Sequence, residues 1–338
     1  MPNTTALLLI NVGSPDSPKK KDVRSYLKRF LYDRRVINAP KLQRWFLVNC
    51  IIAPLRASKS AKLYKQLWSN NGFPLARYAQ LVKGDLQNLL SNHADIFIGM
   101  NYGEPFVNKT LDIIKQNGYT KLIVLPLFPQ YASSTTGVAI DKVMKAIREW
   151  HVIPELRIIN KFYNHPLFIK AFVERIKEYD ISEYDHILFS YHGLPTEHLQ
   201  KMCSVSNTTE CSCEQSFPPG NNMCYKAACY ETTRLIAAEL GLDKNSYSVG
   251  FQSHMSKNWM QPFSNKLVVA KARQGVKKLL VIAPSFVANC LETTIEIAYD
   301  YKKLFQQYGG KQLDLVESLN NSPIWIDALV SIAGLDNM

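Results

Sequence analysis

Short, largely continuous apolar segments recur along the whole chain, with helix-like stretches between them. Each segment is rich in Val, Ile and Leu. Such a run is typical of a strand that is buried on both faces, as in a parallel sheet covered by helices. The segments are residues 6–12, 95–100, 121–127, 156–159, 186–191, 247–252, 278–283 and 313–316. The pattern therefore predicts an α/β fold.

The strands of the first half have counterparts in the second half, in the same order. LLLINVGSP, which ends at Pro15, resembles ILFSYHGLP, which ends at Pro195. GMNY at 99 resembles GFQS at 250, and GYTKLIVLP at 118 resembles GVKKLLVIAP at 275. Chance explains one such match more readily than three in order. We therefore expect two Rossmann-like halves, 1–163 and 164–338, each a four-stranded parallel sheet flanked by helices, with ligands beyond the carboxyl ends of the strands.

The bulk composition limits the class of protein. With 338 residues, 46% of them hydrophobic, the chain is long enough for two domains. We find no apolar stretch of the roughly 18 residues that would span a membrane. The segment MPNTTALLLINVGSPDS lacks the basic start of a signal peptide. We therefore expect a cytoplasmic protein whose seven cysteines are thiols, metal ligands or redox groups.

The charge is strongly basic. Lysine and arginine number 40 against 28 acidic residues, so the net charge is +12 at pH 7. Such a balance suits an anionic partner, although it also suits a protein with nothing more than a basic surface. The sequence carries no nucleic-acid-binding motif, so we expect no nucleic-acid partner.

A histidine and three carboxylates are the strongest candidates for chemistry. His192 directly follows a predicted strand, and the segment SFVANCLETTIEIAYD contains Glu292, Glu296 and Asp300 at intervals of four residues. On a helix these acids share one face, where like charges repel one another. Imidazole and carboxylate together suit a divalent metal such as Fe(II), and either can accept a proton near neutral pH. A solvated helix face is the simpler alternative.

Five separated motifs carry a family resemblance. They are FLYDRRVI at 30, LPLFPQYASSTTG at 125, SYHGLP at 190, FQS at 251 with the Trp and Pro that follow it, and KLLVIAPSFVANCLETTIEI at 278. In this order they resemble the ferrochelatase family, and the likeness runs from LLLINVGSP to ESLNNSPIW. The resemblance implies two Rossmann-like domains and a lyase that inserts Fe(II) into protoporphyrin IX, giving protohaem and two protons.

The resemblance also implies roles for individual residues. His192 and Glu292 match the catalytic pair of the family, and both are expected to meet the metal. Glu296 and Asp300 match the acidic line that continues along the helix as further metal ligands. Whether His192 accepts a pyrrole proton or delivers iron stays open. The chain departs from the family pattern in three places, namely Asn101 for Arg, Asn289 for Asp and Cys290 for His.

Residues 42–68, which we call the lip segment, combine apolar side chains with Arg and Lys. The apolar residues at 42, 45, 46 and 52 fit one helical face, as a core-facing helix would have, but in the family this region forms a lip over the porphyrin. By the resemblance we expect Tyr26, Ile51, Pro74 and Trp259 to contact the porphyrin. An apolar lip ringed by cations can also rest on anionic lipid. We therefore expect peripheral contact with the inner face of a membrane.

Five of the seven cysteines lie in a polar insertion after His192. The spacing of these cysteines does not match the paired CxxC of a zinc ribbon. Some ferrochelatases carry a [2Fe-2S] cluster in an insertion at this place. The resemblance implies that its ligands here are Cys203, Cys211, Cys213 and Cys224. Zinc and reduced thiols remain alternatives.

Two other functions remain open at this stage. The protein is then either a chelatase for another metal or tetrapyrrole, or an iron–sulfur sensor without turnover. Protoporphyrin and coproporphyrin are not distinguished by the sequence. Because the chain ends at SIAGLDNM, without the dimerisation extension found in the family, we expect a monomer.

Overall fold

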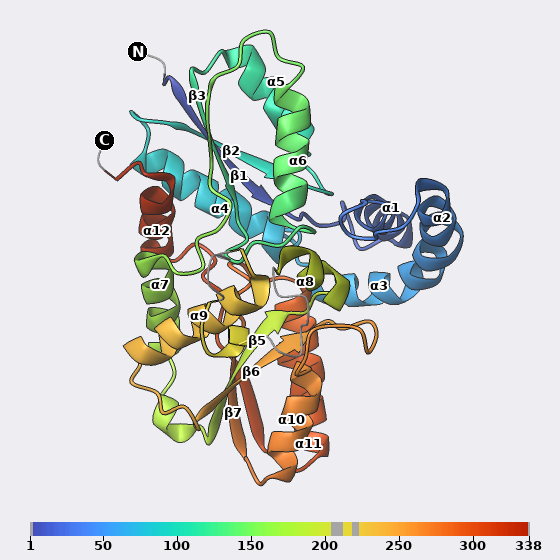
Figure 1. The fold of residues 1–338 in the computed structure, drawn as a ribbon, viewed down its shortest axis with the longest axis vertical. Coiled ribbons are helices and arrows are strands. Elements are labelled where there is room, and N and C mark those ends of the chain that lie inside the picture. The colour runs from blue at the N-terminus through green and yellow to red at the C-terminus, as the bar shows by residue number, and fades with distance from the viewer. Residues whose placement is uncertain (1–2, 204–211, 218–222, 337–338) are drawn as a thin grey trace. The chain divides into compact units, whose positions relative to one another are not determined.

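A computed structural model describes residues 3–203, 212–217 and 223–336. The chain divides into two compact units (Figure 1). Unit 1 comprises residues 1–128, 132–161 and 329–338, and unit 2 comprises residues 129–131 and 162–328. The predicted boundary at 163/164 lies close to the observed one. The final residues, expected in the second half, instead join unit 1, where Arg157 Nη1 donates to the Ala333 carbonyl at 3.0 Å.

Unit 1 contains a four-stranded parallel sheet in the order β2-β1-β3-β4. Its strands are β1 (Thr5–Asn11), β2 (Asp95–Met100), β3 (Lys121–Pro126) and β4 (Glu155–Ile158). Every residue of the central strand β1 is buried, as a continuous apolar run predicts. The helices of this unit are α1 (Lys20–Leu31), α2 (Lys41–Phe46), η1 (Leu47–Ile52), α3 (Ala53–Leu67), α4 (Pro74–Leu89), α5 (Val107–Asn117) and α6 (Thr136–Ile147).

Unit 2 repeats this topology with the strand order β6-β5-β7-β8, again parallel. Its strands are β5 (His186–His192), β6 (Tyr247–Gln252), β7 (Lys278–Ile282) and β8 (Gln312–Leu315). Its helices are α7 (Pro166–Lys177), η2 (Ile181–Glu183), α8 (Thr196–Met202), η3 (Ser212–Glu214), α9 (Tyr225–Glu239), α10 (Ser264–Arg273), η4 (Glu292–Tyr301) and α11 (Lys302–Gln307). Helix α12 (Pro323–Ala333) begins in unit 2 and ends in unit 1.

The two units agree in detail as well as in strand order. In unit 1 the Met100 amide donates to the Pro105 carbonyl at 2.7 Å, and in unit 2 the Phe251 amide donates to the Pro262 carbonyl at 2.8 Å. A Cβ added at Gly250 would lie 2.9 Å from Ser264 Oγ, so the first turn of α10 packs directly on the strand. The predicted division into two four-stranded halves is confirmed.

Each sheet is packed against helices through apolar side chains. In unit 1, Leu8 and Val124 lie in one buried cluster with Leu111 of α5 and Val143 of α6. In unit 2, a second cluster joins β5 and β7 to α10, η4 and α11. Burial of these faces is the main favourable term that holds the elements together. It fixes the carboxyl ends of the strands, where the candidate site lies.

Within the described part of the chain, no helix combines the length and the apolar character that crossing a membrane requires.

Candidate functional site

His192 is the last residue of β5, so its side chain stands at the carboxyl edge of the unit 2 sheet. The residue is half-buried, and its ring centroid lies 6.3 Å from that of Phe286. Ring atom Nδ1 is 2.7 Å from the Gly193 carbonyl oxygen. Because a carbonyl can only accept, Nδ1 carries the proton. In the neutral ring, Nε2 therefore has a lone pair available for a proton or a metal.

The loop after His192 lies tightly against β6. The Gly193 amide donates to the Gln252 carbonyl at 2.8 Å, and a Cβ at position 193 would lie only 2.8 Å from the same oxygen. Only glycine allows so close an approach of two backbones. The position of the histidine is therefore set by the neighbouring strand as well as by its own.

Gln252, which was not among the predicted site residues, joins the strand end at His192 to the start of the helix at Glu292. It is fully buried and pairs with His192 in the register of β5 and β6. Its Oε1 accepts from Ser190 Oγ at 2.7 Å, and its Nε2 donates to the Glu292 carbonyl at 3.4 Å. Gln252 thus ties the end of β5 to the first residue of η4. Its place in the FQS motif, directly after an apolar strand, is the signal that could have identified it.

The acidic segment is a π-helix, η4, which is continued by α11. A π-helix bonds residue i to i+5, and such turns are frequent at functional sites. A side-chain hydrogen bond also joins two residues five apart on this helix, since the Tyr301 hydroxyl donates to Glu296 Oε1 at 2.9 Å. Along this helix exposure increases away from the site, since Glu292 and Glu296 are half-buried and Asp300 is exposed. The three acids lie on one helix, which is wider than the expected α-helix, and their action as a line of metal ligands stays a prediction.

The Glu296 carboxylate already has protein partners on both oxygens. Oε1 accepts from the Ser253 amide at 2.8 Å, and Oε2 accepts from the Ser253 hydroxyl at 2.5 Å. Ser253 has a positive φ of 62°, which brings its amide and hydroxyl to the same carboxylate. Burial, with Glu296 beside it, raises the pKa of Tyr301, so its hydroxyl stays a donor. Glu296 therefore ties β6 to η4, and its predicted role as a metal ligand stays a prediction.

Trp259 lies beside the loop that follows His192, and its contact with a porphyrin stays a prediction. It forms an isolated antiparallel bridge with Pro195, and its ring carbon Cε3 would be 3.6 Å from a Cβ at Gly193. The neighbouring Met260 amide donates to the Leu194 carbonyl at 2.9 Å. The segment that carries Trp259 is therefore fastened to the histidine loop.

The other three predicted porphyrin contacts belong to unit 1. Tyr26 is buried in α1, and its hydroxyl donates to the Gly13 carbonyl at 3.1 Å. Pro74 is the first residue of α4 and is half-buried. Ile51, in the π-helix η1, is 40% exposed. Contact of these residues with a porphyrin stays a prediction.

Two of the departures from the family pattern have structural roles. Asn289 accepts a hydrogen bond from the Ser318 amide at 3.3 Å, and its own amide donates to Asn320 Oδ1 at 2.9 Å. Cys290 is buried and hydrogen-bonded to Thr293, and burial raises the pKa of its thiol. A neutral buried thiol is a poor metal ligand. Neither residue therefore brings a negative charge to the site.

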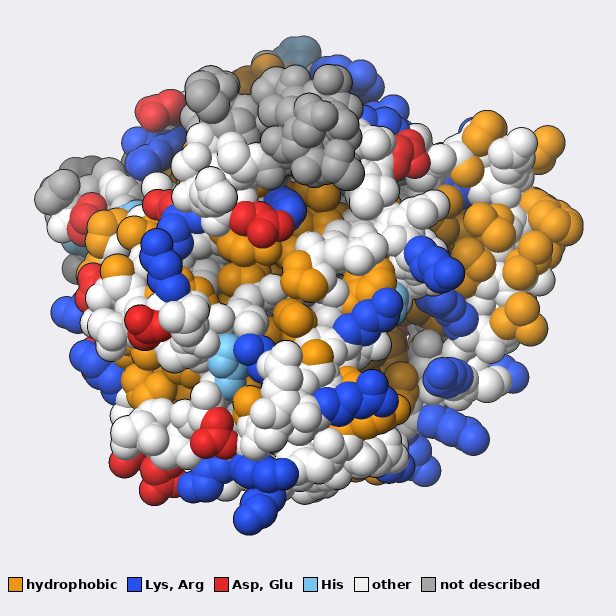
Figure 2. Space-filling view, turned by 60° about the horizontal axis from the view of Figure 1, so that its bottom comes forward, with side chains coloured by type: hydrophobic (Ala, Val, Ile, Leu, Met, Phe, Trp, Pro, Cys, Tyr) orange, Lys and Arg blue, Asp and Glu red, His pale blue; other side chains and the backbone are white. Residues whose placement is uncertain are grey.

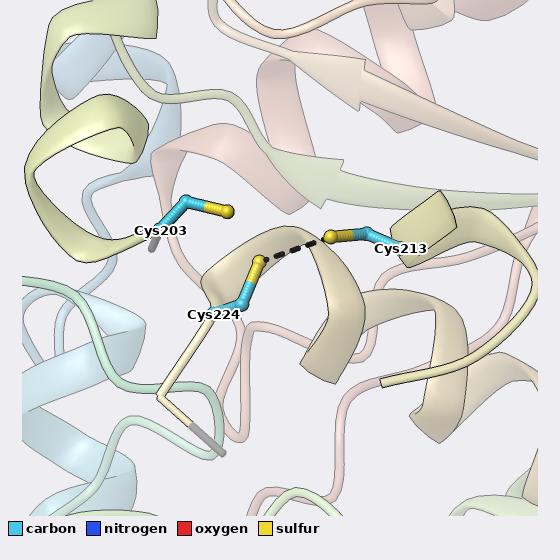
Figure 3. Close-up of side chains that lie close together, drawn as sticks. All are labelled: Cys203, Cys213 and Cys224. Carbon is cyan, nitrogen blue, oxygen red and sulfur yellow. Dashed lines mark hydrogen bonds between the residues drawn. The ribbon is translucent and has the colours of Figure 1, made fainter. Parts of the chain in front are cut away.

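Three cysteines of the insertion converge, and we call them the sulfur trio: Cys203, Cys213 and Cys224 (Figure 3). Their sulfur atoms all lie within 4.8 Å of one another, and Cys213 Sγ is 3.5 Å from Cys224 Sγ. Cys203 and Cys224 are free thiols, whereas Cys213 is held in a disulfide. The fourth predicted ligand, Cys211, lies outside the described residues.

Charged side chains hold the trio together from the side of α9. Lys226 Nζ lies 2.7 Å from Glu214 Oε1, and Arg234 Nη1 donates to the Glu214 carbonyl at 3.1 Å. These contacts dock η3, which carries Cys213, onto the helix that Cys224 begins. The trio lines a cavity of about 300 Å³ that also touches Lys257 and Trp259. Soft sulfur donors grouped in this way fit an iron–sulfur cluster or zinc once Cys213 is reduced.

Known proteins resemble this chain over almost all of its length. A family model described as Ferrochelatase matches residues 4–334. The ferrochelatase of Coxiella burnetii (strain Dugway 5J108-111) is 38% identical over 337 residues, which covers 98% of this chain and 93% of the relative. The ferrochelatase of Legionella pneumophila (strain Lens) is 39% identical over 330 residues, which covers 96% and 97%.

Solved structures share the fold at much lower identity. SirB from Bacillus subtilis with Fe3+ has a TM-score of 0.56 at 10% identity and covers 98% of this chain and 94% of its own. CbiX, the terminal enzyme for biosynthesis of siroheme in denitrifying bacteria, has a TM-score of 0.50 at 12% identity and covers 98% and 99%. These likenesses support the fold alone. Since the family model and the relatives span nearly the whole chain, the protein belongs to the ferrochelatase family.

Proposed function

We propose that this protein inserts Fe(II) into protoporphyrin IX, forming protohaem and releasing two protons. The observation that supports this best is the convergence at the carboxyl edge of the unit 2 sheet. His192 ends β5, Glu292 begins η4, and Gln252 pairs with the first in register and donates to the second at 3.4 Å. These backbone contacts bring the residues that carry an imidazole and a carboxylate to one edge of the sheet, where the two side chains can handle both the protons and the metal of the reaction.

His192 is placed to accept a proton from a pyrrole nitrogen. Its Nδ1 is occupied by the Gly193 carbonyl, so a proton or a metal must approach Nε2. Imidazole is the side chain that most often transfers protons in enzymes, and the free Nε2 leaves His192 able to do so. We assign His192 the role of base, with Glu292 sharing its work.

The acidic residues of η4 could carry protons out of the site or ferrous iron into it. Glu292 lies at the start of the helix and Asp300 near its exposed end, with Glu296 between them. We propose that protons or the incoming ferrous ion pass along this line. Weak, successive carboxylate contacts suit transfer, because a tight cage of four ligands would retain the iron.

An insertion assay tests the function directly. Purified protein is mixed anaerobically with Fe(II) or Zn(II) and protoporphyrin, and the metalloporphyrin is followed by absorbance. His192→Ala should lower kcat by roughly 10²–10⁴-fold, as expected for loss of a general base. His151→Ala, at an exposed position in unit 1, is the matched control. Absence of insertion by the unmodified protein would contradict the proposal.

The same assay separates the alternatives. Insertion of cobalt into a sirohydrochlorin-type ring, with no reaction on protoporphyrin, would indicate a chelatase for another tetrapyrrole. Bound iron and sulfide without any insertion would indicate a sensor. Parallel reactions with coproporphyrin determine which porphyrin has the higher kcat/KM.

We further propose that the cysteine insertion holds a [2Fe-2S] cluster through Cys203, Cys211, Cys213 and Cys224. The three described sulfur atoms within 4.8 Å of one another support this. Such a cluster would supply a redox-sensitive centre and would order a polar segment that has little core of its own. Brown protein whose visible absorbance is bleached by dithionite is expected. Colourless protein with stoichiometric zinc would contradict the cluster.

We also propose that the lip segment rests on an anionic membrane surface at its cytoplasmic face. Figure 2 shows hydrophobic side chains gathered on a projecting part of the surface, with Lys and Arg side chains beside them. Leu42 is 80% exposed, Leu55 74% and Phe46 57%, an unusual exposure for large apolar side chains. Lys59, Lys62 and Lys65 on α3 are exposed beside them. Each cation near an anionic surface contributes about 1 kcal/mol.

Vesicle sedimentation tests the membrane proposal. Protein should pellet with vesicles that contain phosphatidylglycerol and remain in solution with pure phosphatidylcholine. A Leu42→Ser, Leu55→Ser double variant should lose most of this binding. Val152→Ser with Ile153→Ser, which alters two exposed apolar side chains elsewhere in unit 1, should bind as the unmodified protein does. Equal loss in both double variants would contradict a role for the lip segment. Light scattering without lipid checks the expected monomer.

A further inference from the structure

Tyr225 connects the sulfur trio to the catalytic histidine. Its hydroxyl donates to the His192 carbonyl at 2.8 Å and lies 3.4 Å from Ser285 Oγ. The side chain is 4% exposed, and burial raises its pKa, so the hydroxyl remains a donor. Tyr225 directly follows Cys224 in the chain. One peptide unit therefore separates a sulfur of the trio from the residue that holds the end of β5.

A second connection, through helix α8, also runs from His192 to the sulfur trio. Helix α8 begins at Thr196, and Cys203 follows its last residue, with its amide bonded to the Leu199 carbonyl at 2.8 Å. Cys224 is the N-cap of α9, where its sulfur accepts from the Ala227 amide at 3.5 Å. The trio thus joins two elements that are each linked to His192. Helix α8 follows the histidine loop in the chain, and the first turn of α9 is bonded to the His192 carbonyl through Tyr225.

We propose that Tyr225 is a positioning residue that transmits the state of the sulfur trio to His192. The inference rests on the proposed chelatase activity and assigns a purpose to the cysteine insertion. When Cys203 and Cys224 are joined through a common group, the first turn of α9 is fixed and the tyrosine hydroxyl holds the His192 carbonyl. When they are not joined, the first turn of α9 loses this link and is held on η3 by the contacts of Glu214 with Lys226 and Arg234 and by the small buried cluster of Cys213, Cys224, Ala227 and Phe217.

A second hydrogen bond joins α9 to β5 without involving the trio. The Tyr191 hydroxyl lies 2.8 Å from Thr233 Oγ1, about two turns further along the helix than Tyr225. It fixes the body of α9 on the strand, so a change at the sulfur atoms acts mainly on the first turn. It also provides a matched control. Like Tyr225, Tyr191 is a buried tyrosine whose hydroxyl makes a hydrogen bond between β5 and α9.

Steady-state kinetics provide the first test. Tyr225→Phe should lower kcat by about tenfold, since a small misplacement of a catalytic group is sufficient. The KM for porphyrin, the iron and sulfide content and the visible absorbance should match those of the unmodified protein. Tyr191→Phe should retain kcat within about twofold. An unchanged kcat in Tyr225→Phe, or an equal fall in both variants, would overturn the proposal.

A double-mutant cycle tests the coupling itself. Cys203→Ser should lower kcat in the unmodified background and have little further effect when Tyr225 is already Phe. Additive effects would mean that the trio acts on His192 by some other route, and the proposal would fail.

Nuclear magnetic resonance of ring-labelled histidine separates this proposal from the chelatase function. The His192 signal, assigned by its loss in His192→Ala, should shift in Cys203→Ser when Tyr225 is present and should not shift when it is replaced by Phe. This measurement requires no turnover, so it remains decisive even if the protein inserts no metal. If the chemical shift of His192 does not change in Cys203→Ser, the inference is overturned.

Discussion

At the residue scale, the site depends on backbone contacts that hold a few side chains in place. Gln252 and Gly193 illustrate this, because neither has reactive chemistry. Gln252 orders Glu292 and β5 through its amide, and Gly193 allows the histidine loop to lie against the Gln252 carbonyl. Catalytic groups work only when such supports fix their geometry. Substitutions of residues such as Gln252 and Gly193 therefore test the site as sharply as substitutions of the catalytic candidates.

Gly193→Ala should impair both stability and activity. The added Cβ would lie 2.8 Å from a backbone oxygen, which cannot move as a flexible side chain would. We expect a loss of about 1–3 kcal/mol in the free energy of unfolding, typical of overpacking. Urea denaturation measures it. Gly84→Ala, where a Cβ meets nothing within 4 Å, is the control and should be at least as stable as the unmodified protein.

Tyr301→Phe should loosen the tie between β6 and η4. The change removes the donor to Glu296 at 2.9 Å and leaves ring packing in place. Hydrogen bonds to charged groups contribute roughly 1.5–3 kcal/mol, so a loss of about that size is expected. Thermal or urea unfolding would show it. Tyr299→Phe, at an exposed position on the same helix, should change nothing measurable.

At the element scale, parallel strands bring distant residues to one edge and helices then orient them. The apolar runs predicted the strands well, because both faces of each sheet are covered. The π-helical winding of η4 was not predicted. The helix is tied to β6 by the contacts of Glu296 with Ser253, and such contacts form only after the chain has folded.

His186, at the start of β5, should make the free energy of unfolding depend on pH. Burial lowers its pKa from 6.5 to about 4, and its Nε2 is 2.8 Å from Ser248 Oγ. The unfolded chain therefore takes up a proton near pH 6.5, which the folded protein resists until about pH 4. Stability should consequently fall as the pH falls through this window, by at most about 1.4 kcal/mol per pH unit.

Comparison with His186→Gln isolates this contribution. The variant cannot bind the extra proton on unfolding, so its stability curve should be flatter between pH 6.5 and about 4. Urea unfolding across that range measures the difference between the two proteins. Parallel curves would show that His186 titrates alike in both states and would contradict the prediction.

At the scale of the whole molecule, one α/β plan is used twice, and the two copies differ in what they carry. Unit 1 carries the lip segment after its first strand, and unit 2 carries His192, the cysteine insertion and the acidic helix. The net charge of +12 belongs to the entire chain and favours anionic surfaces and ligands. The contribution of this net charge to the binding of anionic vesicles should therefore decrease as the salt concentration rises.

Binding to anionic vesicles should weaken markedly when the salt concentration is raised from about 0.05 M to about 0.5 M, since the Debye length shortens from roughly 14 to 4 Å. Sedimentation at each concentration measures the bound fraction. Residual binding at high salt reports the apolar contribution of Leu42 and Leu55, and it should disappear in the serine double variant. Binding that ignores salt would contradict an electrostatic contribution.

The sequence by itself determined the α/β class, the two four-stranded halves, the family and the catalytic candidates, because apolar runs and motifs are local properties of the chain. The tertiary structure alone decided that Gln252 joins His192 to Glu292, that Glu296 is bound by Ser253, and that Tyr225 links the sulfur trio to the histidine. These contacts connect residues on different elements. Their partners are chosen by packing, and packing leaves no periodic trace in the sequence.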